Sequence, residues 1–169
     1  MDTPYVLIET SSGDILVELY PDKAPETVAN FLQYVDDGFY RNTIFHRVIA
    51  DFMIQGGGLT MTLAEKPTRP SIKNEADNGL KNAAGTLAMA REAAPHSAKA
   101  QFYINTVDNP ELDFVEATND GFGYCVFGQV TDGLEVVEKI GRTKTKAQGE
   151  HQNLPVDSVV ITAVSRFEL

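Results

Sequence analysis

An arginine and a glutamine in an otherwise apolar segment are the first residues that could do chemistry. Residues 45–57 read FHRVIADFMIQGG, with Arg47 near the start and Gln55 further along. A guanidinium is planar and always charged, so a fixed one can stabilise an electron pair that develops on a bound substrate. An ordinary arginine lying across apolar surface on an edge strand gives the same pattern, and composition alone favours that explanation.

A second segment combines an arginine, an amide and an aromatic pair. Residues 85–91 read GTLAMAR and residues 100–105 read AQFYIN. By residue type alone, Phe52, Met53, Phe102 and Tyr103 are most simply core residues. These two segments therefore need the rest of the chain before a function can be assigned to them.

The evidence for other kinds of functional site is weaker. Residues 56–58 are three glycines without the spacing of a phosphate loop, and they predict a turn with positive φ. Ser97 follows His96, but the sequence has no G-x-S-x-G elbow, so a hydrolase is a minor alternative. No metal site is expected, because the spacing of four candidate ligands matches no compact motif (His46, His96, Cys125 and His151).

Composition narrows the classes of protein. The chain has 169 residues and a net charge of −10, and its single cysteine cannot form an internal disulfide. Its longest apolar runs are four residues, far short of the roughly 20 that a spanning helix needs. An acidic chain repels phosphate groups, so binding to nucleic acid or to an anionic membrane is not expected. With no secretory signal visible, we expect one cytoplasmic domain over residues 1–169, and a monomer.

Two helices are expected to support these segments. Pro25 suits the first helical position, and Val28, Phe31, Leu32 and Val35 form one apolar face. Gly38 can adopt the left-handed conformation that ends a helix.

The second helix is predicted over residues 133–140. Asp132 and Glu135 have capping-box spacing. Leu134, Val137 and Ile140 are expected to face the core.

The remaining signals are strands. A hairpin is predicted from residues 5–9 and 15–20, and further strands at residues 44–49, 52–55, 86–90, 102–106, 125–130 and 158–167. Residues 59–84 are polar and predict a long ordered loop. Many short strands with two helices, without βαβ alternation, indicate a mainly β protein built on a closed or nearly closed antiparallel barrel whose ends the helices cover.

Most of the chain resembles the cyclophilin family of peptidyl-prolyl cis-trans isomerases. The matching segments include the first helix and both reactive segments, at residues 23–31, 38–40, 43–49, 74–75, 85–90, 101–104 and 126–130. Residues 94–98 and 123–125 are similar to the bacterial cytoplasmic branch. The resemblance implies an eight-stranded antiparallel barrel with two capping helices, which isomerises X–Pro bonds of peptides and folding proteins without a cofactor.

The same resemblance implies a role for individual residues. Arg47 would be catalytic, stabilising the twisted amide while Gln55 holds it. The other predicted substrate-binding residues would line the proline pocket and its peptide groove (Phe52, Met53, Ala90, Arg91, Gln101, Tyr103, Leu112 and Tyr124). The alternative is a non-catalytic proline-peptide binding module or chaperone that uses the same groove; retention of Arg47 and Gln55 favours the enzyme.

Three positions depart from the family pattern. Tyr103 replaces a usual Phe, and its hydroxyl needs a partner if it is buried. Tyr124 replaces a frequent His. Glu111 stands where many relatives carry an aromatic residue, so the inhibitor cyclosporin, a possible ligand of the family, is expected to bind only weakly.

Overall fold

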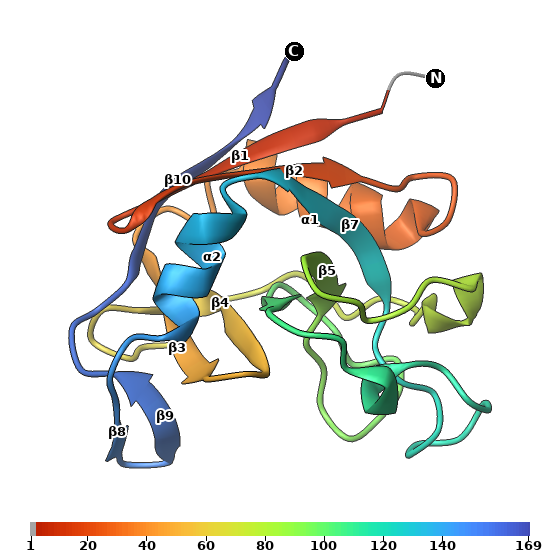
Figure 1. The fold of residues 1–169 in the computed structure, drawn as a ribbon. Coiled ribbons are helices and arrows are strands. Elements are labelled where there is room, and N and C mark those ends of the chain that lie inside the picture. Colours follow the sequence, from red (N-terminus) through yellow and green to blue (C-terminus); the bar gives the residue numbers. More distant parts are fainter. Residues whose placement is uncertain (1–2) are drawn as a thin grey trace.

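The computed structural model describes residues 3–169, which form ten strands, two α-helices and two short 3₁₀ helices (Figure 1). The strands are β1 Tyr5–Thr10, β2 Gly13–Leu19, β3 Thr43–Ile49, β4 Met53–Thr60, β5 Thr86–Met89, β6 Phe102–Asn105, β7 Val126–Asp132, β8 Thr145–Gln148, β9 His151–Pro155 and β10 Val160–Phe167. The helices are α1 Pro25–Asp36, η1 Ala76–Asn78, η2 Pro110–Leu112 and α2 Leu134–Gly141.

Eight of the strands close a barrel. Their order is β1-β10-β3-β4-β6-β5-β7-β2, and β2 returns to pair with β1. Every neighbouring pair is antiparallel. The closed eight-stranded barrel expected from the sequence is therefore confirmed. Since β3 pairs with both β10 and β4, Arg47 does not lie on an edge strand.

The two faces of the barrel wall bury different apolar clusters. Inside, Phe102 and Ile104 of β6 pack with Ile54 of β4 and with residues of both α-helices. On the outer face, Met53 and Tyr103 join a second, smaller cluster that the loops cover. Side chains alternate between the faces of a strand, so one strand serves both clusters. The second cluster is the floor of the candidate site.

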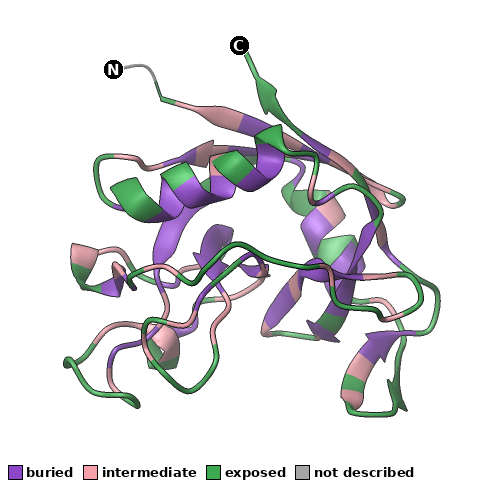
Figure 2. Cartoon of the chain, turned by 180° about the vertical axis from the view of Figure 1, so that it is seen from behind, coloured by how far each residue is buried: buried purple, intermediate pink, exposed green. Residues whose placement is uncertain are grey.

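Helix α1 follows the predicted pattern. Pro25 occupies its first turn, its buried face includes Phe31, and Gly38 has φ +68° just beyond its end. Figure 2 shows the buried face of α1 turned toward the barrel and its exposed face outward. The carboxylate of Glu75, from the long loop, accepts hydrogen bonds from the N–H and the hydroxyl of Thr27. A carboxylate at this end stabilises the helix, because its negative charge lies near the positive pole of the helix dipole.

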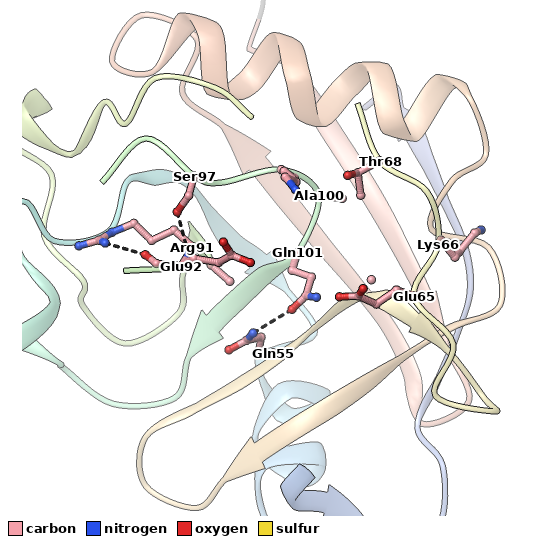
Figure 3. Close-up of a pocket in the computed structure, with 12 residues that line it drawn as sticks. Gln55, Glu65, Lys66, Thr68, Arg91, Glu92, Ser97, Ala100 and Gln101 are labelled. Atoms are coloured by element: carbon pink, nitrogen blue, oxygen red, sulfur yellow. Dashed lines mark hydrogen bonds between the residues drawn. The ribbon is translucent and has the colours of Figure 1, made fainter. Parts of the chain in front are cut away.

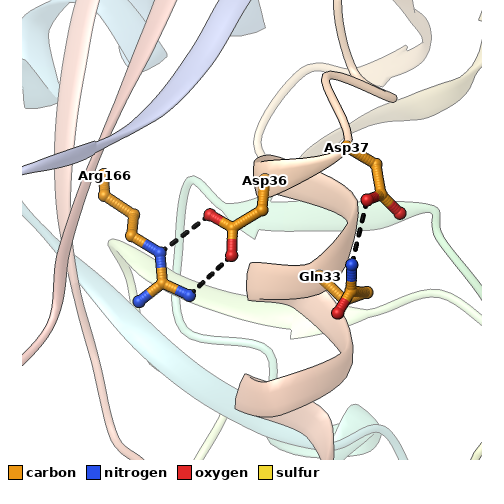
Figure 4. A network of polar contacts seen from close by, with 4 residues as sticks. All are labelled: Gln33, Asp36, Asp37 and Arg166. Carbon is orange, nitrogen blue, oxygen red and sulfur yellow. Dashed lines mark hydrogen bonds and ion pairs between the residues drawn. The ribbon is translucent and has the colours of Figure 1, made fainter.

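The last turn of α1 contains Asp36, at the end of the helix that disfavours negative charge. Arg166 of β10 compensates by donating from Nε and Nη2 to the two carboxylate oxygens, each at 2.8 Å (Figure 4). These hydrogen bonds are the main reason that the pKa of Asp36 lies below its usual value. Both side chains of the pair are about half exposed, so the ion pair contributes little to the free energy of folding. Its main effect is to connect the end of α1 to strand β10.

Helix α2 corrects two details of the sequence prediction. The predicted capping box is wrong: Gly133 is the N-cap, in a left-handed conformation and without a side-chain cap. Val137 and Ile140 are buried as expected, but Leu134 is 44% exposed. Leu134 is the first residue of this eight-residue helix, and helical spacing alone does not bury it.

The glycines at residues 56–58 also differ from the prediction. They lie inside β4, and only Gly57, with φ +87°, needs the predicted positive φ. A Cβ on Gly57 would come within 2.8 Å of the Phe102 ring, and one on Gly58 within 2.5 Å of Gln101. Close approach of side chains at Gly57 and Gly58, and of the neighbouring backbone at Gly56, therefore explains these glycines better than a turn does.

The C-terminal hairpin and the long loop complete the fold. Strands β8 and β9 form a two-stranded sheet that the sequence analysis missed, because β8 is fully exposed and carries no apolar alternation. The loop predicted at residues 59–84 begins two residues later, since β4 includes Leu59 and Thr60. It is ordered by a bridge between Ile72 and Ala98 and by Lys66, whose ammonium lies 4.9 Å from the Phe39 ring centroid.

Candidate active site

The strand register brings three predicted site residues into one row. Arg47 of β3 pairs with Gln55 of β4, and Gln55 pairs with Tyr103 of β6. Residues opposite each other on antiparallel strands lie on the same face of the sheet. Ala88 of β5 extends the row beyond Tyr103. The row lies on the outer face of the barrel, where loops rather than strands can complete a pocket.

A cavity of about 180 Å³ lies over this row. Two loops close it: the segment after β5 contributes Arg91, and the segment between β6 and β7 contributes Leu112. Nine of the ten predicted site residues line it (Arg47, Phe52, Met53, Gln55, Ala90, Arg91, Tyr103, Leu112 and Tyr124). The arrangement combines one exposed guanidinium with a mostly apolar floor, at a size suited to a small ring.

The tenth predicted residue, Gln101, lies beside the cavity and supports it. Arg47 Nη1 donates to Gln55 Oε1 at 3.2 Å, and Gln55 Nε2 donates to Gln101 Oε1 at 3.0 Å. These two hydrogen bonds orient the Gln55 amide so that its oxygen faces the guanidinium of Arg47. Figure 3 shows Gln55 and Gln101 meeting at the edge of a neighbouring cavity of about 190 Å³, which also contacts Arg91 and Glu92.

Arg91 is held in place by backbone carbonyls of the two loops. Its guanidinium donates to the carbonyl oxygens of Glu92, Ala93, Asn119 and Gly123 at 2.9–3.2 Å. It also lies 4.7 Å from the centroid of the Tyr124 ring. Arg91 therefore joins the loop after β5 to the loop before β7, and so shapes the pocket wall that the two loops form.

Tyr103, the departure from the usual Phe, is buried and its hydroxyl has a partner. The hydroxyl donates to Asn82 Oδ1 at 2.7 Å. Burial is the main cause that raises the pKa of Tyr103 well above its usual value, so the phenol stays neutral. Sequence reasoning did not single out Asn82; the only available signal was that a buried tyrosine requires a polar partner.

The hydrolase pair and the candidate metal ligands have other partners. Ser97 Oγ donates to the carbonyl of Ala94, and His96 Nδ1 accepts from the N–H of Asn74, so both side chains order loops. Within residues 3–169, no three His, Cys, Asp or Glu side chains gather in a way that could hold a metal ion. The same part of the chain contains no helix long and apolar enough to span a membrane.

Comparison with known proteins identifies the family. The family model described as cyclophilin type peptidyl-prolyl cis-trans isomerase matches residues 5–166. The chain belongs to this family, and it is therefore an isomerase of the X–Pro peptide bond rather than a binding module.

Close relatives are bacterial. Peptidyl-prolyl cis-trans isomerase B of Escherichia coli K12 is 56% identical, over 96% of this chain and 99% of that protein. Peptidyl-prolyl cis-trans isomerase cyp18 of Streptomyces antibioticus is 54% identical, over 92% and 94%.

The fold has solved counterparts. A cyclophilin type isomerase of Cryptosporidium parvum superposes with a TM-score of 0.81 at 27% identity, covering 99% of both chains. A second crystal structure of that protein, in the presence of the dipeptide Ala-Pro, gives a TM-score of 0.79 at 27% identity, covering 98% of this chain and 99% of the other.

Proposed function

We propose that this chain accelerates rotation about X–Pro bonds of peptides and folding proteins, with Arg47 as the catalytic group and the cavity over Met53 and Tyr103 as the proline pocket. The observation that carries the proposal is a guanidinium, hydrogen-bonded to Gln55, that lines a small cavity together with several apolar side chains.

Isomerisation forms no bond between enzyme and substrate. It requires that the enzyme bind the twisted X–Pro bond more tightly than the planar one. Resonance gives the peptide bond a rotational barrier of about 18–20 kcal/mol, and uncatalysed X–Pro exchange takes tens of seconds or more. Twisting the bond localises a lone pair on the proline nitrogen. An enzyme that binds this twisted state better than the planar states lowers the barrier. A 10⁵-fold acceleration would need about 7 kcal/mol of such preference.

Arg47 is suited to supply part of this preference. Gln55 Oε1 occupies one N–H of its guanidinium, which leaves other donors of the fork for the substrate. The Gln55–Gln101 contact fixes Gln55, so little reorganisation is needed during the reaction. An apolar floor would hold the proline ring while the carbonyl side of the bond rotates. No titrating base, nucleophile or cofactor takes part.

The partners follow from the same chemistry. Proline-containing peptides and unfolded or folding proteins are the proposed substrates, and the related Cryptosporidium structure was solved in the presence of Ala-Pro. We place the protein in the cytoplasm, acting as a monomer in protein folding. Neither nucleic acid nor a membrane is a proposed partner, because the chain carries a net charge of −10.

A protease-coupled assay on a short proline peptide tests the catalytic role. Replacing Arg47 with Ala should lower kcat/KM at least about 100-fold, since the guanidinium acts mainly in the transition state. Arg47→Lys should also be poor, because a compact ammonium cannot both contact Gln55 and reach the substrate as the fork does.

Arg142→Ala is the matched control, because this exposed arginine lies at the C-cap of α2, away from the cavity. It should keep wild-type activity. Near-wild-type turnover by folded Arg47→Ala would show that the catalytic assignment is wrong.

A further inference from the structure

Asn82 is a buried asparagine that contacts three residues of the cavity at once. It lies just before β5, its side chain is 2% exposed, and it does not line the cavity itself. Both ends of its amide are used. A buried amide with all its hydrogen-bonding capacity satisfied by neighbouring segments holds those segments in one arrangement.

The amide oxygen of Asn82 fixes the floor of the cavity. It accepts from the hydroxyl of Tyr103 at 2.7 Å and from Nδ2 of Asn105 at 3.1 Å. Asn105 in turn accepts from Asn109, whose Nδ2 also donates to the carbonyl of Phe52 at 2.9 Å. The network therefore connects two lining residues of the cavity, Tyr103 and Phe52, through the side chains of three buried asparagines.

The amide nitrogen of Asn82 fixes the opposite wall. It donates to the carbonyl of Leu112 at 3.1 Å and to the carbonyl of Tyr124 at 3.4 Å. It also lies 3.2 Å from Asp113 Oδ1, which accepts the backbone N–H of Asn82 as well. Leu112 and Tyr124 are the two ends of the loop over residues 112–124, and the N–H of Tyr124 donates to the carbonyl of Leu112. Asn82 thus closes the neck of this loop.

We propose that Asn82 is a positioning residue for isomerisation, which sets the width of the proline pocket by fixing Tyr103 relative to Leu112 and Tyr124. This inference rests on the proposed function, in which the cavity receives the proline ring. Arg47 and Gln55 are held by a separate hydrogen-bond chain, so loss of Asn82 should weaken peptide binding more than it slows turnover.

The test measures the Kd and kcat of a short peptide with one Ala–Pro bond for two variants. Asn82→Ala removes both arms of the amide, whereas Asn82→Asp keeps the acceptor oxygen, loses the donor and places a carboxylate beside Asp113. Both should raise Kd about 10-fold with kcat within about threefold of wild type, because ground-state binding is what each change removes.

Carbon NMR of the Tyr103 ring Cζ separates the two arms. Its resonance, assigned by its loss in Tyr103→Phe, should shift in opposite directions in the two variants, because Asn82→Ala removes the acceptor and Asn82→Asp replaces it with a stronger, charged one. If Asn82→Ala does not fold, the Kd of the isosteric Asn82→Asp decides alone.

Asn30→Ala is the matched control, since Asn30 is another buried asparagine that donates to a backbone carbonyl, that of Lys99, outside the proline pocket. It should leave Kd within about twofold of wild type. An unchanged Kd in both Asn82 variants, or an equal rise in Asn30→Ala, would overturn the proposal. Failure of the proposed function reads differently: Arg47→Ala would keep full turnover while the Asn82 variants still raised Kd.

Discussion

Arg47 owes its properties to two features of its surroundings. Its guanidinium is exposed to the groove, while its neighbour Gln55 is oriented by Gln101 through a 3.0 Å hydrogen bond. A charged group that stayed fully hydrated would pay reorganisation energy during the reaction, and one that was fully buried would need a counter-ion. The position at the rim of an apolar cavity avoids both costs.

We expect the sensitivity to cyclosporin to depend on Glu111. It lines a separate cavity of about 490 Å³, which shares Arg91, Leu112 and Tyr124 with the cavity over Tyr103. An indole at this position would supply apolar area and an N–H donor, whereas a carboxylate resists desolvation. The loss should amount to about 2–4 kcal/mol, or roughly 30- to 1000-fold in affinity.

We therefore expect weak inhibition of the wild type by cyclosporin and partial recovery in Glu111→Trp. Inhibition titrations of the isomerase activity of both proteins check this. Peptide turnover without inhibitor should be alike in the two proteins, which serves as the control. Nanomolar inhibition of the wild type would contradict the assigned role of Glu111.

Between elements, the contact of β9 with β3 contains an unusual buried histidine. His46 of β3 packs edge-on against His151 of β9, with ring centroids 5.9 Å apart, and its Nδ1 is buried without a hydrogen-bond partner. Burial, reinforced by His151 and Arg47, lowers the pKa of His46 from 6.5 to about 4. The folded protein therefore favours the neutral imidazole.

This shift makes the barrel–hairpin contact sensitive to acid. Because the folded pKa lies below the unfolded one, the unfolded chain takes up the proton first as pH falls. The contribution of neutral His46 is complete above pH 6.5 and is lost progressively as the pH falls toward 4. Between pH 7 and pH 4.5 the loss should be about 2–3 kcal/mol of unfolding free energy.

Urea unfolding of wild type and His46→Phe at the two pH values tests this expectation. Many carboxylates also titrate in this range, and taking the difference between the two proteins cancels their effect. The wild type should lose about 2–3 kcal/mol more than His46→Phe on acidification. Equal losses in the two proteins would mean that His46 is protonated as readily in the folded state as in the unfolded one.

In the whole molecule, catalysis and stability should respond differently to pH. The titratable side chains that line the cavity over Tyr103 are arginines and tyrosines. Side chains of these two types ordinarily titrate at about pH 10 or above. Burial raises the pKa of Tyr103 further. We therefore expect kcat/KM to be nearly flat between about pH 6 and pH 8.

Steady-state rates across this range, with circular dichroism to confirm folding at each pH, provide the measurement. A decline below pH 6 should follow the unfolded fraction rather than the chemistry. A bell-shaped profile centred near neutrality, in protein that remains folded, would implicate a histidine and contradict the mechanism.

Local chemistry in the sequence was sufficient for much of the fold. The helix at Pro25 and most strands were predictable, because periodicity of apolar residues and turn-forming residues act over a few positions. The strand pattern indicated a closed or nearly closed barrel, and the resemblance to a known family added the number of strands and the ten site residues, nine of which line one cavity. The exposed β8 and the exposure of Leu134 were not predictable, since both depend on what lies across space.

Only the tertiary structure decided how the site is held together. The sequence by itself determined that a guanidinium, an amide and an apolar set were present, and that a buried Tyr103 would need a partner. The partner of Tyr103 is Asn82, which the loop before β5 brings next to β6. The same asparagine also connects the two ends of the loop over residues 112–124. A hydrogen bond between residues far apart in sequence leaves no periodic signal, because its geometry is set by the packing of whole elements rather than by neighbouring residues.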